Sequence, residues 1–180
     1  YGNVVDTVTN RFVVIGSADR DVAYSDNGGA TWVLTSNALP AVSYDHLIYG
    51  AGKFVAIQSN STNAAYSSDG ITWTNVTAPG TFATVTDITW GNGKFVAIGG
   101  TNGIMYSLDG VTWVENALSL PLTATERKVA YGQGTFVITS DDTNEVQYSH
   151  DGLYWQSYTL ATTVTGGYNA IAFGNPAREG

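Results

Sequence analysis

Short apolar runs bounded by glycine, asparagine and serine recur along the whole chain. Segments such as 54–57 and 95–98 are rich in β-branched and aromatic residues, and turn residues follow within a few positions. Such short runs are typical of β-strands, and the apolar spacing of a helix appears nowhere. The pattern therefore predicts an all-β chain of short strands joined by tight turns.

Two motifs repeat in phase. The first reads Tyr-Ser-x-Asp-Gly-x-Thr-Trp with small variations, and its tryptophans lie 41, 40 and 42 residues apart at Trp32, Trp73, Trp113 and Trp155. The second combines an aromatic residue, two glycines and Phe-Val, and begins at Tyr49, Trp90 and Tyr131. Tyr1-Gly2-Asn3 followed by 11–16 is a fourth copy with a six-residue insertion. A fixed period of this size predicts a repeat architecture.

Each repeat divides into four short strands, which is the size of one blade of a β-propeller. We expect one propeller domain over 1–175, with repeats at about 1–48, 49–89, 90–130 and 131–172 and a tail at 176–180. Segment 169–173 resembles an extra first strand, so it is expected to complete the first blade and close the ring. Four blades of a longer propeller, or half a ring completed by another chain, are the alternatives. Because the chain opens at Tyr1, it is expected to be a processed product, an excised domain or the ordered part of something longer.

The recurring polar residues are expected to be structural. A carboxylate in the hairpin between the third and fourth strands can accept hydrogen bonds from backbone N–H groups, while glycine supplies the positive φ. Catalysis needs one asymmetric site rather than four copies. This structural role is predicted for Asn27, Asp69, Asp109 and Asp151, and for Trp32, Trp73, Trp113 and Trp155, whose rings pack on the neighbouring sheet.

The first motif resembles the Asp-box, or bacterial neuraminidase repeat, of sialidases and many non-enzymatic propellers. The copy at 25–32 has the standard length with Asn27 in place of Asp, and the other three are one residue shorter. The shortened form, together with the second motif, looks like repeats of phage tail, fibre and other virion-associated proteins. The resemblance covers essentially the whole chain and implies a propeller displayed on a virion or outside the cell.

The composition limits the classes of partner that the chain is expected to bind. Charged residues are 12% of the chain, against roughly 25% in average proteins, and the formal net charge is −8. An acidic chain without a basic patch argues against nucleic acid and anionic membranes as partners. No apolar stretch of the sequence is long enough to predict insertion into a membrane. There is no cysteine, and His46 and His150 lack metal-ligand spacing. No metal and no cofactor are expected.

The sequence also argues against an enzyme. The resemblance implies that a sialidase would need three arginines on the substrate carboxylate, a tyrosine nucleophile and two acids. The four arginines are Arg11, Arg20, Arg127 and Arg178, and only Arg20 and Arg127 are expected in loops on one face. The adjacent Asp141 and Asp142 are expected to be solvated. We therefore expect no catalytic residues, with a sialidase-like remnant as an alternative.

Binding is expected where the repeats differ, in the loops opposite the conserved hairpins. At one aligned position of the first strand the copies carry His46, Asp87, Lys128 and Ala170. These side chains are expected either to ring the central channel as ligand contacts or to link the blades. The alternative is that a strand end near solvent simply tolerates polar residues.

Further candidate ligand contacts are the loop aromatics Tyr44, Phe82 and Tyr168 and the arginines Arg20 and Arg127. The alternative for the three aromatics is that each packs its loop onto its own blade. Loops of low charge rich in Ser, Thr, Asn and Tyr suit neutral polar ligands. The leading hypothesis is a non-enzymatic binding and display module that recognises a cell-surface glycan or protein. A purely structural module that contacts other virion proteins or copies of itself is the second.

Overall fold

The structure is a computed structural model of the 180-residue chain. It describes residues 10–16, 19–41, 44–59, 61, 63–77, 85–99, 103–116, 127–141, 143–161 and 165–174. Every regular element in these ranges is a β-strand, which confirms the predicted all-β class.

Four antiparallel sheets follow one another along the chain, and each is one blade of the β-propeller. The first blade contains β1 (Phe12–Ile15), β2 (Val22–Ser25) and β3 (Val33–Thr35). The second contains β4 (His46–Gly50), β5 (Lys53–Ile57), β6 (Asn63–Ser67) and β7 (Thr74–Thr77). The third contains β8 (Val85–Gly91), β9 (Lys94–Gly99), β10 (Gly103–Ser107) and β11 (Val114–Asn116). The fourth contains β12 (Arg127–Gly132), β13 (Thr135–Ser140), β14 (Glu145–Ser149) and β15 (Gln156–Thr159).

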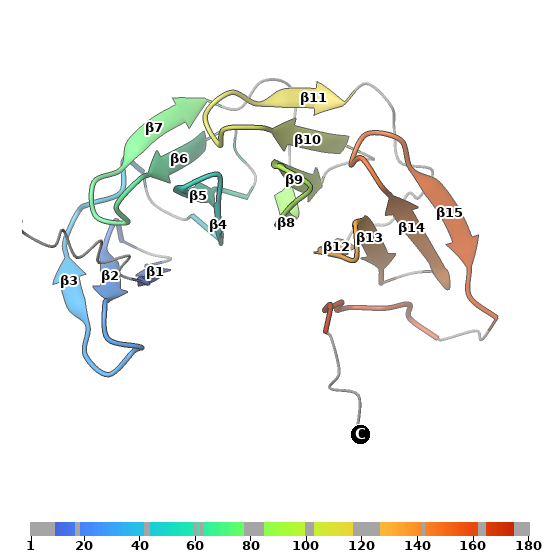
Figure 1. Ribbon diagram of the computed structural model, residues 1–180, viewed down its shortest axis with the longest axis horizontal. Coiled ribbons are helices and arrows are strands. Elements are labelled where there is room, and N and C mark those ends of the chain that lie inside the picture. Colours follow the sequence, from blue (N-terminus) through green and yellow to red (C-terminus); the bar gives the residue numbers. More distant parts are fainter. Residues whose placement is uncertain are drawn as a thin grey trace, which may run out of the picture.

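The blades lie side by side along an arc (Figure 1). The inner strands β4, β8 and β12 line its concave side, and β7, β11 and β15 form the convex side. The first blade and segment 165–174 lie at opposite ends of the arc. No pairing between 169–173 and β1 is recorded among the described residues, so closure within one chain stays a prediction. Tyr1 and the tail at 176–180 lie outside the described residues.

Two-residue turns join the inner strand of each later blade to its second strand. Ala51 and Gly52 both have positive φ, 48° and 72°, while Gly50 pairs with Lys53. The turns at 92–93 and 133–134 have the same signs of φ. Positive φ at both central residues is the type I′ geometry, whose twist matches that of antiparallel strands. The second sequence motif therefore encodes these hairpins.

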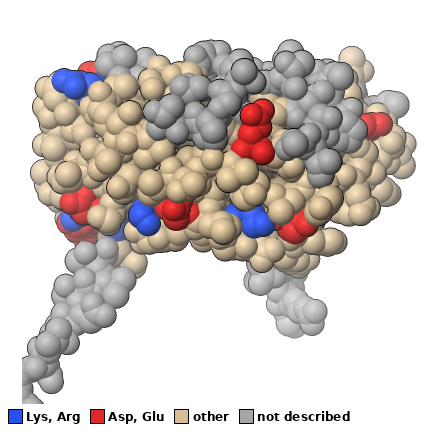
Figure 2. Space-filling view, turned by 90° about the horizontal axis from the view of Figure 1, so that it is seen from above, with Lys and Arg blue, Asp and Glu red and all other residues tan. Residues whose placement is uncertain are grey.

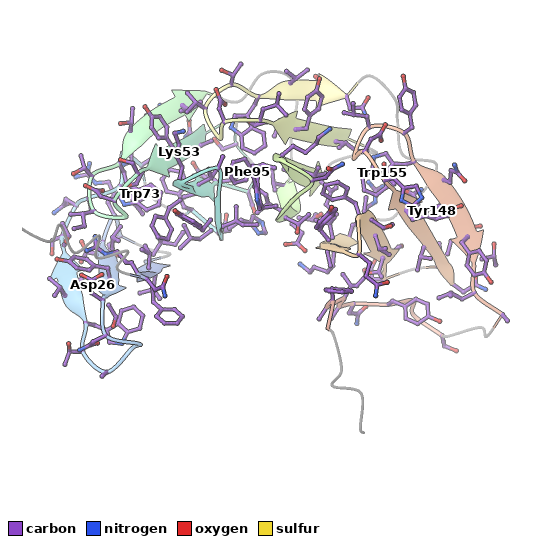
Figure 3. All side chains as sticks on the ribbon, in the orientation of Figure 1. Asp26, Lys53, Trp73, Phe95, Tyr148 and Trp155 are labelled. Carbon is purple, nitrogen blue, oxygen red and sulfur yellow. The ribbon has the colours of Figure 1, made fainter. Side chains whose placement is uncertain are left out.

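The hydrophobic core lies between the blades. One cluster combines Val55 and Ile57 of the second blade with Phe95 and Trp113 of the third. Side chains fill the spaces between neighbouring sheets, where Phe95 and Trp155 are labelled (Figure 3). Each blade thus depends on its neighbours for burial, as in other repeat proteins.

The hairpin tryptophans pack against the preceding blade. Trp73 is buried in a cluster with Val22 of the first blade, and Trp155 packs on Val96 and Ile98 of the third. Trp32 of the first blade is 45% exposed. Its exposure follows from its position, because the described residues place no blade before it.

Candidate functional site

The conserved aspartates each close their own hairpin. Oδ1 of Asp69 accepts hydrogen bonds of 2.8 Å from Ser67 Oγ and from the backbone N–H groups of Ile71 and Thr72. Gly70 follows with φ 71°. Equivalent sets of bonds surround Asp109 and Asp151. These carboxylates are therefore engaged by their own turns.

The same hydrogen bonds change the acidity of these groups. Partial burial acts to raise the pKa of Asp69, but the N–H groups of Thr72 and Ile71 outweigh it and lower the pKa to about 2. Hydrogen bonds from Thr112 and Val111 also lower the pKa of Asp109. At Asp151, N–H groups of the turn overcome burial and lower the pKa as well. All three are acceptors held in the ionised form, the reverse of a general acid poised near neutral pH.

The first hairpin uses different groups. Asn27 Oδ1 accepts from the Thr31 N–H at 2.9 Å, and its Nδ2 donates to Thr31 Oγ1 at 2.8 Å. Asp26 instead forms a two-pronged ion pair with Arg11, with both N···O distances 2.7 Å. Arg11 also donates to the carbonyl of Asp69 in the second blade. Arg11 thus ties the first two hairpins together.

His46, Asp87 and Lys128 hold equivalent places on β4, β8 and β12, opposite Ile57, Ile98 and Thr139. His46 Nε2 lies 3.3 Å from the carbonyl of Val85 in the next blade. Asp87 Oδ2 accepts from the backbone N–H of Val129 at 3.0 Å, and Lys128 donates to the carbonyl of Thr86 at 3.1 Å. The three side chains link inner strands of neighbouring blades, and a ligand role for them stays a prediction.

Two of the other candidate contacts lie in the protein interior. Tyr44 is 1% exposed and packs in the core, where burial raises its pKa, so it offers no ring face to a ligand. Arg127 is not in a loop as expected: it begins β12 and is buried. Arg20 donates to Asn37 Oδ1 at 2.9 Å and so orders a connection of the first blade. Phe82 lies outside the described residues.

Tyr168 does line a pocket. Its backbone N–H donates to the carbonyl of Ser140 at 2.6 Å, which folds the segment back over the end of β13. This loop-side pocket has a volume of about 280 Å³ and is lined by Lys128, Asp141, Tyr168 and Asn169. Two sequence candidates, Lys128 and Tyr168, are therefore brought together. Asp141 was expected to be merely solvated, and Asn169 was not singled out.

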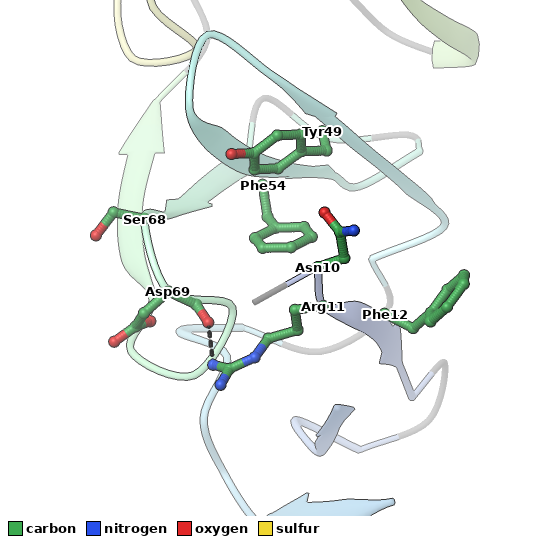
Figure 4. Close-up of a pocket in the computed structure, with 7 residues that line it drawn as sticks. All are labelled: Asn10, Arg11, Phe12, Tyr49, Phe54, Ser68 and Asp69. Carbon is green, nitrogen blue, oxygen red and sulfur yellow. Dashed lines mark hydrogen bonds between the residues drawn. The ribbon is translucent and has the colours of Figure 1, made fainter. Parts of the chain in front are cut away.

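A second pocket lies on the side of the conserved turns. This turn-side pocket, of about 600 Å³, is lined by Asn10, Arg11, Phe12, Tyr49, Phe54, Ser68 and Asp69 (Figure 4). It lies between the first two blades, and sequence reasoning missed it because that face carries the conserved motifs. The only indication of this pocket in the sequence is the six-residue insertion between segments 1–3 and 11–16, which no other repeat has.

Charge is sparse over the convex surface, and most charged side chains visible there follow one rim (Figure 2). Within the described ranges, no three His, Asp or Glu side chains gather as metal ligands would. The same ranges contain no helix long and apolar enough to cross a membrane.

Comparison with solved structures supports the propeller. A streptogramin B lyase structure matches with TM-score 0.63 and 16% identity, over 79% of this chain and 48% of that chain. Virginiamycin B lyase from Staphylococcus aureus matches with TM-score 0.63 and 13% identity, over 83% of this chain and 55% of that chain. A chain of a nidogen/laminin complex matches with TM-score 0.62 and 12% identity, over 87% of this chain and 63% of that chain.

These identities show the fold alone, and the chain spans 48% to 63% of the length of the matched chains. No family model matches the chain, and no curated protein matches it. The Asp-box family and the phage origin therefore stay predictions.

The expectation that the chain is not an enzyme is overturned. Two of these structural neighbours are lyases, so a propeller of this kind can carry catalysis. The sequence argument tested only sialidase and metal chemistry, and the repeated aspartates say nothing of other reactions. The neighbours are consistent with a binding or structural module and equally with an enzyme.

Proposed function

We propose that the chain is a binding module that holds a polar, hydroxyl-rich ligand such as a glycan in the loop-side pocket. One observation carries the proposal: a pocket of about 280 Å³ is lined by four residues whose side chains carry an ammonium, a carboxylate, an amide and a phenol ring. Pockets that bind small molecules combine an apolar or aromatic surface with a few convergent polar groups.

The four lining residues match the chemistry of a sugar. The carboxylate of Asp141 accepts from hydroxyl groups, and Asn169 can both donate and accept. Lys128 has three donor hydrogens, of which one is used on the carbonyl of Thr86. The ring of Tyr168 provides an apolar face with a polar edge. The formal charges of Lys128 and Asp141 cancel, which favours a neutral ligand.

The site is also held on a rigid support. Lys128 lies on β12 and contacts β8, while the N–H of Tyr168 is bonded to the end of β13. A site built on packed strands keeps its groups in place without a ligand, which lowers the entropic cost of binding.

We propose further that the module is displayed on a phage virion or a secreted bacterial structure. The sparse charge, the acidic composition and the resemblance of the repeats support this placement. Neighbouring tail, baseplate or capsid genes would agree with it, and a neighbourhood of cytoplasmic metabolic genes would contradict it.

Glycan-array binding by the 180-residue chain tests the ligand class. Tyr168→Ala and Asp141→Asn should each weaken binding to the best glycan at least 10-fold. The matched control is Tyr158→Ala, an exposed tyrosine on β15, which should leave affinity unchanged. Equal losses for Tyr158→Ala and Tyr168→Ala, or a blank array, would contradict the proposal. Chromatography of the bound glycan shows whether it is also cleaved.

A further inference from the structure

Neighbouring blades touch through an aromatic ring and a glycine at the ends of their inner strands. A Cβ atom on Gly50 would overlap the ring of Trp90, and one on Gly91 would overlap the ring of Tyr131. Gly132 meets Phe173 in the same way. Phe173 and its neighbours therefore occupy the inner-strand position that follows the fourth blade. We call this ring-on-glycine packing the inner contact.

A second contact joins each hairpin to the preceding blade. A Cβ atom on Gly70 would lie 2.6 Å from Val13 Cγ2, and one on Gly110 would lie 2.6 Å from Val55 Cγ2. Gly152 meets Val96 at 3.0 Å in the equivalent place. We call this glycine-on-valine packing the hairpin contact.

Among the described residues, the first blade forms neither the inner contact nor the hairpin contact on the side that faces away from the second blade. Tyr49 packs on Phe54, with ring centroids 4.8 Å apart, yet it is 56% exposed and no described glycine covers it. Phe12 on β1 is 57% exposed. A Cβ atom on Gly28 would meet nothing within 4 Å. Trp32, in the same hairpin, is exposed to solvent. Phe12 and Tyr49 both line the turn-side pocket (Figure 4).

The other end of the chain offers the complementary groups. Phe173 is 51% exposed, and a Cβ atom on Gly174 would meet nothing within 4 Å. Val137 on β13 holds the place of Val55 and Val96 and is not fully buried. Within the second blade, Tyr49 pairs with Phe54 and Gly50 with Lys53. The same register would place Phe173 opposite Phe12, and Gly174 against the uncovered ring of Tyr49.

We propose that two copies of this chain associate head to tail, with segment 169–174 of each copy serving as the inner strand of the other copy's first blade. The interface would continue the inner contact and the hairpin contact that already join the blades within one chain. It fills the turn-side pocket and covers Phe12, Tyr49 and Trp32 together.

Ring geometry is compatible with two copies. A head-to-tail contact closes when its rotation returns to the start. Two copies hold eight blades, at the upper end of the roughly four to eight found in propellers. The arc also superposes on propeller chains of which it covers only 48% to 63%. This partial coverage is compatible with a ring larger than four blades.

Disulfide trapping tests the pairing directly, because the chain has no cysteine of its own. The register places Ile171 opposite Val14, and side chains opposite one another on paired strands are close enough for a disulfide. A mixture of Val14→Cys and Ile171→Cys chains should form a mixed disulfide dimer under mild oxidation. The matched control replaces Val14→Cys by Leu34→Cys, an exposed site on the outer strand β3, and should not cross-link.

One chain carrying both cysteines separates the competing arrangements. A cross-link confined to a single chain would mean closure within the chain and would overturn the proposal. Absence of the mixed dimer would overturn it too, since residues 1–9 or another segment would then occupy the edge of β1.

Light scattering with a glycine variant gives an independent measurement. The unaltered chain should have twice its 19.0 kDa mass. Gly174→Val has free space within its own chain but would collide with the partner's Tyr49, so it should be monomeric with unchanged circular dichroism. Ala161→Val, at another exposed position, should remain dimeric. A monomeric parent chain, or a dimeric Gly174→Val, would overturn the proposal.

Discussion

The carboxylate of Asp87 accepts a hydrogen bond of 3.0 Å from the backbone N–H of Val129, in the neighbouring blade. Its other oxygen accepts from the N–H of Ile88 at 2.9 Å. One side chain therefore satisfies the backbone of two inner strands that belong to different sheets. The polar position where the repeats disagree thus has a role in joining the blades.

Replacing Asp87 should weaken this junction. Asp87→Ala leaves the N–H of Val129, a buried residue, without its acceptor, which costs about 1–3 kcal/mol of unfolding free energy. Asp87→Asn keeps one acceptor oxygen and should cost less. Urea denaturation of both variants measures the difference, with the exposed Glu115→Ala as control. An Asp87→Ala protein as stable as the control would contradict the assigned role.

The hairpin carboxylates should act as stabilising acceptors. Asp69→Ala removes the acceptor for the N–H groups of Ile71 and Thr72 and should cost about 1–3 kcal/mol. Asp69→Asn retains a carbonyl oxygen, as Asn27 does in the first hairpin, and should cost less. Thermal unfolding measures both effects. Leu108→Ala, at the exposed variable position of the next hairpin, should change stability little, and an equal loss there would refute the prediction.

Stability should fall at acid pH for the same reason. The folded-state pKa of Asp69 is about 2, and those of Asp109 and Asp151 are also lowered, whereas an unfolded aspartate titrates near 3.9. Stabilisation by depressed carboxylates is fully present above the unfolded pKa and is lost as pH falls through the folded pKa. Unfolding free energy should therefore decline between about pH 4 and pH 2. Asp69→Asn should flatten this decline, and an unchanged slope would count against it.

A substitution in the first turn of the second blade should raise the stability of the protein. Ala51 has φ 48°, a left-handed conformation that costs an ordinary L-residue about 1–2 kcal/mol. Asn92 has φ 46° at the equivalent place, and asparagine tolerates this region better. Ala51→Asn should raise the unfolding free energy by up to about 1 kcal/mol.

The reciprocal change is the control for that turn. Asn92→Ala should lower stability by more than Ala51→Asn raises it, because it also removes the bond from Asn92 Nδ2 to the carbonyl of His150. Urea denaturation measures the unfolding free energy of both variants. An increase in both would show that the left-handed conformation at this turn position does not determine their stability.

Sequence reasoning succeeded where a contact is local. The spacing of Trp32, Trp73 and Trp113 predicted the blades, and the alignment placed His46, Asp87 and Lys128 at one register position, as the strand pairing shows. Turn residues and strand alternation act over a few positions, so one sequence is enough to detect them.

Sequence reasoning failed where a contact joins segments that are distant in the chain. Tyr44 was a candidate ligand contact, with packing of its loop as the alternative, and only packing between the first two blades shows that it is buried. Arg127 was expected in a loop because the boundary of β12 lies at the residue itself. The loop-side pocket depends on the bond from Tyr168 to Ser140, which links the end of the fourth repeat to its middle. No periodicity within the chain encodes that bond.

The inner contact needs only one ring and one glycine from each repeat, and the second, third and fourth repeats each carry both. A duplicated repeat would therefore carry the complementary surface for both of its neighbours. Unequal recombination could lengthen or shorten the array without requiring new side chains at the junctions between blades. Blade number would then change in whole repeats, while substitutions in the loops changed recognition independently.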